Sequence, residues 1–192
     1  MGNLKIICAA LTLALGFNST TQAQDNSAAQ NQDSVRRVVE EVPQLKNLYR
    51  VSAIKTPSGF PVPRYVTLKV GKVNGRTGPS LEHPILWQYR RKGLPLVVVA
   101  ETDMWRKVRD VEGDESWVHK PALSGERRVI VVNEAMLRAK PRDTSRVKAS
   151  LAENALLNLM ECNDTQWCLI QSDDGMKGWA PMRKLWGAHK LY

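Results

Sequence analysis

The stretch that decides the fold is residues 73–125, VNGRTGPSLEHPILWQYRRKGLPLVVVAETDMWRKVRDVEGDESWVHKPALSG, because its pattern returns later in the chain. A shift of 62 positions, the offset from Arg76 to Arg138, brings the same residue types into register without a gap. The shared positions are Arg76 and Arg138, Pro79 and Pro141, Trp105 and Trp167, Gly113 and Gly175, and Trp117 and Trp179. A fixed internal period indicates a duplicated structural unit. We therefore expect two copies of one small domain, residues 59–125 and 126–192.

Each copy consists of short apolar or alternating runs that are separated by turn-forming residues. In the first copy these runs are residues 65–70, 94–100, 104–109 and 116–119, with turns at residues 101–103 and 112–114. Runs of this length, rich in β-branched and aromatic residues, are typical of strands joined by tight turns. The second copy repeats the order with runs at residues 155–160, 167–171 and 178–180. The sequence predicts an all-β fold of two tandem small barrels.

Three motifs of the first copy resemble the bacterial SH3-like (SH3b) domain family. They are the N-x-R-x-G-P loop of residues 74–79, the W-x-K-V run of residues 105–108, and Gly113 followed by Trp117-Val118. The resemblance covers residues 60–192, and the lead-in at residues 59–65 is similar to that of exported tandem members. It implies a barrel of five to seven strands and a binding role, to peptidoglycan or to a protein, without catalysis.

The sequence departs from the family pattern at several positions. Gly75 stands where the family usually has an apolar strand residue. The second copy keeps the arginine and the proline of the loop but loses its Asn and Gly, and Ala180-Pro181 replaces Val118-His119. These departures weaken any binding role that the resemblance implies for the second copy.

The first 23 residues have the pattern of a cleaved export signal. Lys5 precedes an apolar run at residues 6–17, and Thr21-Gln22-Ala23 forms a small-x-small cleavage site. A membrane anchor is the alternative, but the run is shorter than the roughly 20 residues needed to span a bilayer. Residues 24–58 follow as a flexible leader, with a short helix at residues 35–42. We expect a periplasmic or secreted protein without a transmembrane segment after cleavage.

Cysteine usage agrees with export. Cys8 leaves with the signal, so the mature chain keeps Cys162 and Cys168. An even number of cysteines in an oxidising compartment favours a disulfide between them. Two free thiols in neighbouring strands are the alternative.

Charge and motifs limit the classes of function. A net charge of +9 suits an anionic neighbour, and solubility alone is the alternative. No nucleic-acid motif is present in the sequence, and no HxxxH, HxH or Gly-x-Ser-x-Gly pattern marks a metal site or a nucleophile. We predict a non-enzymatic binding module without cofactor or metal, and the sequence leaves its oligomeric state open.

Comparison of the copies sorts the residues by role. We expect shared positions to serve the fold: the tryptophans as core or rim, Arg76 and Arg138 by bonding turn carbonyls, and Gly113 and Gly175 in turns. Positions special to the first copy are the candidate ligand-binding residues: His83, Trp87, Tyr89, Arg90, Arg91 and His119. Together they would form an aromatic and basic surface. The alternatives are that Trp87 packs between the barrels and that residues 90–92 form a solvated charge run.

The ligand that this surface would bind is cell-wall material, with peptidoglycan as the first choice. The alternative is a protein-interaction scaffold that docks a peptide or an envelope enzyme. We expect the partner to be a wall polymer or an envelope protein and not a nucleic acid.

Overall fold

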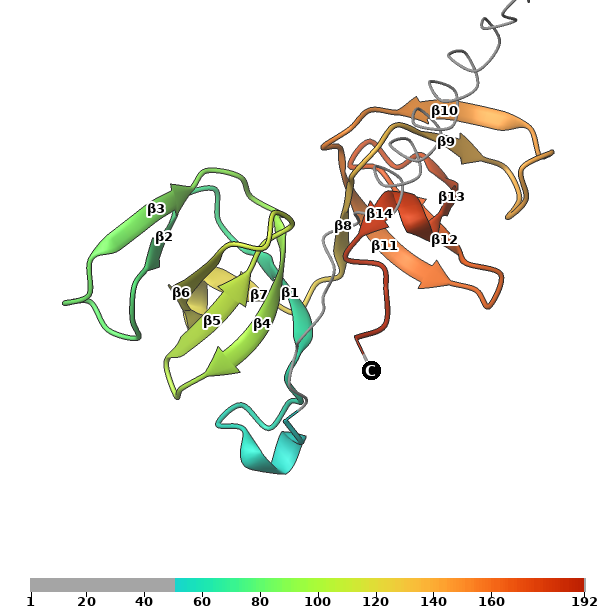
Figure 1. Cartoon of the computed structure of the whole chain (residues 1–192). Coiled ribbons are helices and arrows are strands. Elements are labelled where there is room, and N and C mark those ends of the chain that lie inside the picture. Colours follow the sequence, from blue (N-terminus) through green and yellow to red (C-terminus); the bar gives the residue numbers. More distant parts are fainter. Residues whose placement is uncertain (1–50, 192) are drawn as a thin grey trace, which may run out of the picture. The chain divides into compact units, whose positions relative to one another are not determined.

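The computed structural model describes residues 51–191, which form two barrels of antiparallel strands (Figure 1). The described residues contain no α-helix, only three short 3₁₀ turns, and none of their helices is long and apolar enough to cross a membrane. The predicted signal peptide, the short helix and the leader up to residue 50 lie outside the described residues. The all-β prediction is confirmed.

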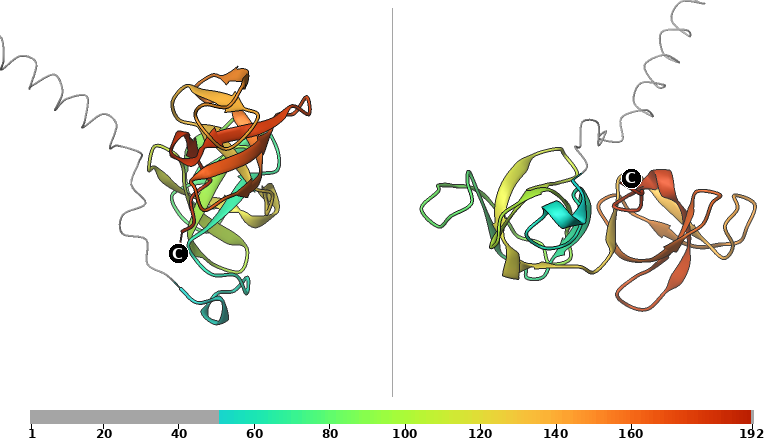
Figure 2. Two further views of the ribbon diagram at one scale, coloured as in Figure 1. Left: turned by 90° about the vertical axis from the view of Figure 1, so that its right-hand side faces the viewer. Right: turned by 90° about the horizontal axis from the view of Figure 1, so that it is seen from below.

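The first barrel is a seven-stranded sheet with the order β3-β2-β6-β5-β4-β1-β7. All its pairings are antiparallel, and seen from below the sheet curls around a central core (Figure 2). Its elements are β1 (Arg64–Leu68), β2 (Val73–Arg76), β3 (Ile85–Tyr89), β4 (Pro95–Glu101), β5 (Trp105–Arg109), β6 (Glu115–His119), η2 (Lys120–Ala122) and β7 (Leu123–Ser124).

The second barrel repeats this arrangement with the order β10-β9-β13-β12-β11-β8-β14. Its elements are β8 (Arg128–Val131), β9 (Ala135–Arg138), β10 (Val147–Leu151), β11 (Leu156–Cys162), β12 (Trp167–Gln171), β13 (Lys177–Pro181), η3 (Met182–Lys184) and β14 (Leu185–Trp186). The bounds of β2, β3, β5, β6, η2 and β7 recur in this barrel at an offset of 62. The predicted duplication is therefore a duplication of structure.

The offset of 62 does not hold at two strands, so the expectation of a gapless repeat needs a correction. Leu68 of β1 pairs with Leu123, and Val131 of β8 pairs with Leu185, so these two strands correspond at an offset of 63. Leu96 of β4 pairs with Val66, and Leu157 of β11 pairs with Val129 in the equivalent place. The residue with positive φ before each strand is Gly93 in one copy and Asn154 in the other. The second copy thus has one residue fewer before β11, and it regains that residue in the β11–β12 turn.

Each barrel has its own apolar core, because alternate strand residues point to one face of a sheet. Leu96, Val98, Val108 and Val118 are fully buried in the first core. Val129, Val131, Ile170 and Leu185 are buried in the second. A third cluster joins residues of both copies: Tyr65 and Val97 pack with Ile130 and Trp186.

The third cluster shows which tryptophan lies at the contact of the two copies. Tyr65 meets Trp186 edge to face, with ring centroids 5.6 Å apart. The described residues 51–191 belong to one compact unit. Trp87 instead packs against the core of the first barrel, so the structure does not support the alternative that it lies between the barrels.

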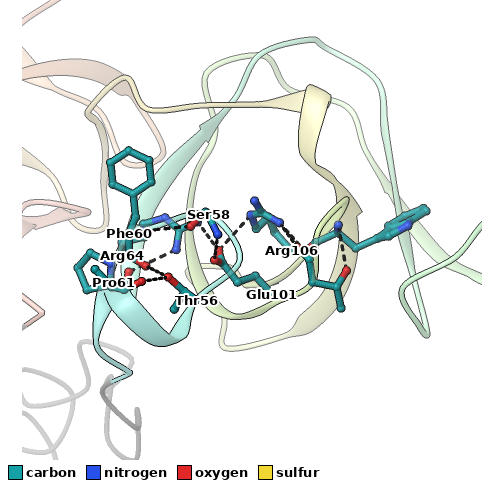
Figure 3. A network of polar contacts seen from close by, with 10 residues as sticks. Thr56, Ser58, Phe60, Pro61, Arg64, Glu101 and Arg106 are labelled. Atoms are coloured by element: carbon teal, nitrogen blue, oxygen red, sulfur yellow. Dashed lines mark hydrogen bonds and ion pairs between the residues drawn. The ribbon is translucent and has the colours of Figure 1, made fainter.

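A buried ion network ties the lead-in segment to the first barrel (Figure 3). Glu101 at the end of β4 contacts Arg64 at 2.5 Å and Arg106 at 3.1 Å, and the Glu101 side chain is only 2% exposed. Its other carboxylate oxygen accepts the backbone N–H of Ser58 at 2.9 Å. The last residues that the sequence assigned to the flexible leader are therefore fixed onto β4, beside η1 (Ala53–Lys55).

Candidate functional site

The structure places Tyr89 in the core, not on a ligand-binding surface. Its ring is 7% exposed, and its hydroxyl lies 3.1 Å from Ser116 Oγ. Burial raises the pKa of Tyr89, and the hydrogen bond from Ser116 offsets part of that rise. Because neither face of the ring is open, Tyr89 cannot stack on a ligand in this structure.

Trp87 is half-buried and fills a space that Gly75 leaves empty. The two residues pair across β2 and β3. A Cβ atom on Gly75 would lie 2.5 Å from Ser116 Oγ and 3.1 Å from Trp87 Nε1. The glycine is therefore required chiefly by Ser116, with Trp87 as a second close neighbour, which explains the departure from the family pattern at this position. The ring edge of Trp87 also meets Tyr89, with centroids 6.1 Å apart.

The three basic residues after β3 are exposed. Arg91 donates a hydrogen bond from Nη2 to the backbone carbonyl of Asn154 in the second copy, at 2.7 Å. Arg90 and Lys92 are exposed. The structure thus assigns Arg91 a contact with the other copy and buries Tyr89, so the predicted surface does not include Tyr89.

His83 belongs to the loop between β2 and β3 and shapes it. Its Nδ1 lies 2.8 Å from Ser80 Oγ, and its ring covers Gly78 so closely that a Cβ there would lie 2.2 Å from it. Its carbonyl accepts a hydrogen bond from Arg76 Nη1 at 2.7 Å. Arg138 makes the equivalent bond to the Ser145 carbonyl at 2.8 Å, so the predicted structural role of the shared arginines is confirmed.

His119 is the predicted site residue that lies at an open groove. It is exposed at the end of β6, and its ring stands 5.1 Å from that of Trp105. The groove has a volume of about 190 Å³. Its lining comes from four separate segments: Lys72, Val73, Asn74, Arg76, Leu81, Trp105, His119 and Ala122. Leu81, which is 70% exposed, is the large apolar side chain of this lining that is open to solvent.

The chemistry of this groove is particular to the first copy. At the equivalent positions of the second copy, Glu134 replaces Lys72, Asp143 replaces Leu81 and Pro181 replaces His119. The basic and apolar lining thus becomes acidic and loses its imidazole. Sequence reasoning missed Lys72 and Leu81, although this same replacement at an offset of 62 could have identified them.

Three carboxylates of the β5–β6 turn lie within 4.8 Å of one another: Asp110, Glu112 and Asp114. Asp110 Oδ1 accepts the backbone N–H groups of Glu112 and Asp114 at 3.1 and 3.0 Å. Burial raises the pKa of Asp110, and these backbone bonds oppose the rise. The geometry of the turn, in which Gly113 adopts a φ of 97°, explains why these carboxylates lie close together.

The sequence of each copy matches the model of one family, the bacterial SH3 domain. The matches cover residues 69–125 and residues 131–187. These matches cover more than half of the chain. The chain belongs to the bacterial SH3 domain family. Both copies are therefore bacterial SH3 domains, and the resemblance inferred from the loop and tryptophan motifs is confirmed.

Similarity to other known proteins is limited. No curated protein matches the chain. Among solved structures, NlpC2 from Trichomonas vaginalis is 14% identical over 67% of this chain and 49% of its own, with a TM-score of 0.31. NlpC1 from the same organism is 15% identical over 65% of this chain and 45% of its own, with a TM-score of 0.30. The chain spans about half the length of these two proteins.

Proposed function

We propose that this protein is a non-enzymatic binding module of the cell envelope, which recognises peptidoglycan through the groove of its first SH3 domain. The export signal predicted at residues 1–23 supports a periplasmic or secreted location. Family membership supports a binding role, and the net charge of +9 favours an anionic polymer as its partner.

The observation that carries the proposal is the groove beside Trp105. An exposed imidazole at His119, the cation of Lys72 and an exposed leucine converge there from different segments. An aromatic and apolar floor with a basic rim suits a sugar or peptide that carries acidic groups. The second copy, which shares the fold, lacks this combination.

Binding to purified sacculi tests the proposal. The double variant Lys72→Glu and Leu81→Asp gives the groove the residues of the second copy, and we expect it to lower the amount bound at least about tenfold, as the loss of a few groove contacts would. Lys140→Glu with Met136→Asp makes the same charge change at exposed sites of the second copy and serves as the control. Wild-type binding no stronger than that of an unrelated basic protein would refute the proposal, as would equal losses in both variants.

A second function has a specific observation in its favour. Leu81, Ile85 and Leu86 are 70%, 51% and 48% exposed along β3 and the loop before it. Exposed apolar side chains close together are typical of protein contact surfaces. The alternative is therefore an envelope scaffold that docks a peptide or an enzyme. Ile85→Ser with Leu86→Ser should then abolish a co-purified partner and leave binding to sacculi unchanged.

A further inference from the structure

A cleft of about 790 Å³ lies apart from the groove of the first domain. Its walls are the start of β1, Arg127 of the linker, the β11–β12 hairpin and the C-terminal residues 188–191. This volume falls in the range of roughly 300–1,000 Å³ that small-molecule sites occupy, and contacts between domains are a common place for such sites.

Two buried polar atoms in the lining residues lack hydrogen-bond partners among residues 51–191. They are the hydroxyl of Tyr65 and Nε2 of His189. Tyr65 is only 8% exposed, and the nearby Gly187 carbonyl accepts its 2.8 Å hydrogen bond from Arg127 Nη2 instead. A buried polar group without a partner costs roughly 1–3 kcal/mol, so its retention asks for an explanation.

The environment of both groups holds them in their neutral forms. Burial raises the pKa of Tyr65 to about 12, although Arg127, 5.1 Å from the ring centroid, and the backbone of Gly187 act against this rise. Burial lowers the pKa of His189. At neutral pH the tyrosine therefore keeps a proton that it can donate, and the imidazole carries no charge.

The charges of the lining are of both signs. Arg64 is already engaged by Glu101, which leaves Arg127 and Lys190 as the cations. Glu161 and Asp164 on the β11–β12 hairpin supply carboxylates. Apolar wall residues stand among them: Leu159, Met160, Met182 and Leu191. A ligand with a carboxylate, an ammonium group and small apolar side chains would match this lining.

We propose that the cleft binds a short peptide, with the free C-terminal carboxylate beside Arg127 and Tyr65 and the amino end toward Glu161 and Asp164. The guanidinium of Arg127 and the hydroxyl of Tyr65 are donors suited to a carboxylate. The site is independent of the groove beside Trp105, and its chemistry does not depend on peptidoglycan being the partner of that groove.

Titration of the full chain with trialanine, observed by amide NMR, tests this site. We expect saturable shifts at Gly187, Ala188 and Arg127, and no saturable shifts with the C-terminal amide of the same peptide. The absence of saturation with trialanine overturns the proposal, and so does equal binding of the amide form. Shifts confined to the groove of His119 and Trp105 would also overturn it.

Tyr65→Phe supplies the variant that separates binding from folding. The hydroxyl has no partner in the described part of the chain, so its removal should leave the fold intact. We expect the dissociation constant for trialanine to rise about tenfold, because a hydrogen bond to a charged group is lost. Tyr89→Phe removes the hydroxyl of the other buried tyrosine among the described residues, outside the cleft, and should leave the affinity unchanged. An unchanged affinity in Tyr65→Phe contradicts the proposal.

Discussion

The β4–β5 hairpin of the first domain and the β11–β12 hairpin of the second are closed by different chemistry at the same place. Arg106 pairs across the strands with Glu101, whereas Cys168, its equivalent, pairs with Cys162. The first pair is a buried ion pair, and the second is a disulfide, which confirms the predicted bridge. One cross-strand position thus accepts an ionic or a covalent link, provided that both partners change together.

The cores differ in the same coupled way. In the first copy Gly75 makes room for Trp87 and Ser116, and in the second copy Leu137 stands in place of Gly75. Gly178 then replaces Ser116, and a Cβ atom on it would lie 2.5 Å from Leu137 Cγ. A residue that only one copy carries can therefore still be required by the packing of its own barrel. Its neighbours in the same barrel differ between the copies as well and compensate for the change in volume. Functional residues are therefore better sought among differences that have no such compensating neighbour.

The largest effect that we predict comes from Glu101→Ala. This substitution leaves Arg106, whose side chain is 3% exposed, without its carboxylate, and the loss of one partner of a buried pair costs roughly 3–5 kcal/mol. Native-state hydrogen exchange of the full chain should show this loss in β4 and β5 and little change in β11 and β12. Glu112→Ala, an exposed acid of the same domain, is the control. A loss below about 1 kcal/mol would contradict a structural role for the network.

The second prediction breaks the matched core of the first domain. Gly75→Leu alone introduces a side chain against Ser116 and Trp87, and such overpacking costs roughly 1–3 kcal/mol. The four-fold exchange Gly75→Leu, Trp87→Ala, Tyr89→Leu and Ser116→Gly installs the residues of the second copy and should recover part of this loss. The measurement is the urea unfolding of the full chain. If the four-fold variant has a lower free energy of unfolding than Gly75→Leu, the core residues of the second copy cannot replace those of the first as a set.

The fold and the duplication could be predicted because they depend on residues that both copies repeat. Arg76 and Arg138 donate hydrogen bonds to loop carbonyls at equivalent positions of the two copies, and Trp105 and Trp167 are both buried. The disulfide could also be predicted from the sequence, since Cys162 and Cys168 bracket a single turn. These features are local in the chain, where spacing determines geometry.

The site was harder to predict because it depends on packing between distant segments. Tyr89 has no aromatic counterpart in the second copy and so looks free to bind a ligand, yet its hydroxyl lies 3.1 Å from Ser116 Oγ inside the core. Trp186, not Trp87, meets the other copy, and its equivalent in the first domain is Ser124. The groove joins Lys72, Leu81 and His119 across three segments, and no single motif contains them. The sequence marks these three residues as a group only through their replacement by different residue types in the second copy.

The last prediction uses acid and reductant to separate the two hairpins. Burial raises the pKa of Glu101, but hydrogen bonds from Ser58 and Arg64 lower it more, so the folded value lies below 4.5. A carboxylate with a depressed pKa stabilises the fold at neutral pH, and this contribution is lost as the pH falls below about 4.5. Acid should therefore loosen β4 and β5 first, while reductant should loosen β11 and β12 by roughly 2 kcal/mol, as expected for a short loop.

Hydrogen exchange at pH 7 and pH 4, corrected for intrinsic rates and run with and without reductant, measures both effects in one molecule. Glu101→Gln should remove the Glu101 contribution to the acid response of β4 and β5 and leave the reductant response of β11 and β12 unchanged, because the glutamine cannot titrate in this range. Glu115, whose pKa is also lowered, by Lys107 and Arg109 against an opposing effect of burial, adds to the acid response of the first domain only. Equal loosening of both hairpins by either treatment would show that the ionic and the covalent closures do not act locally.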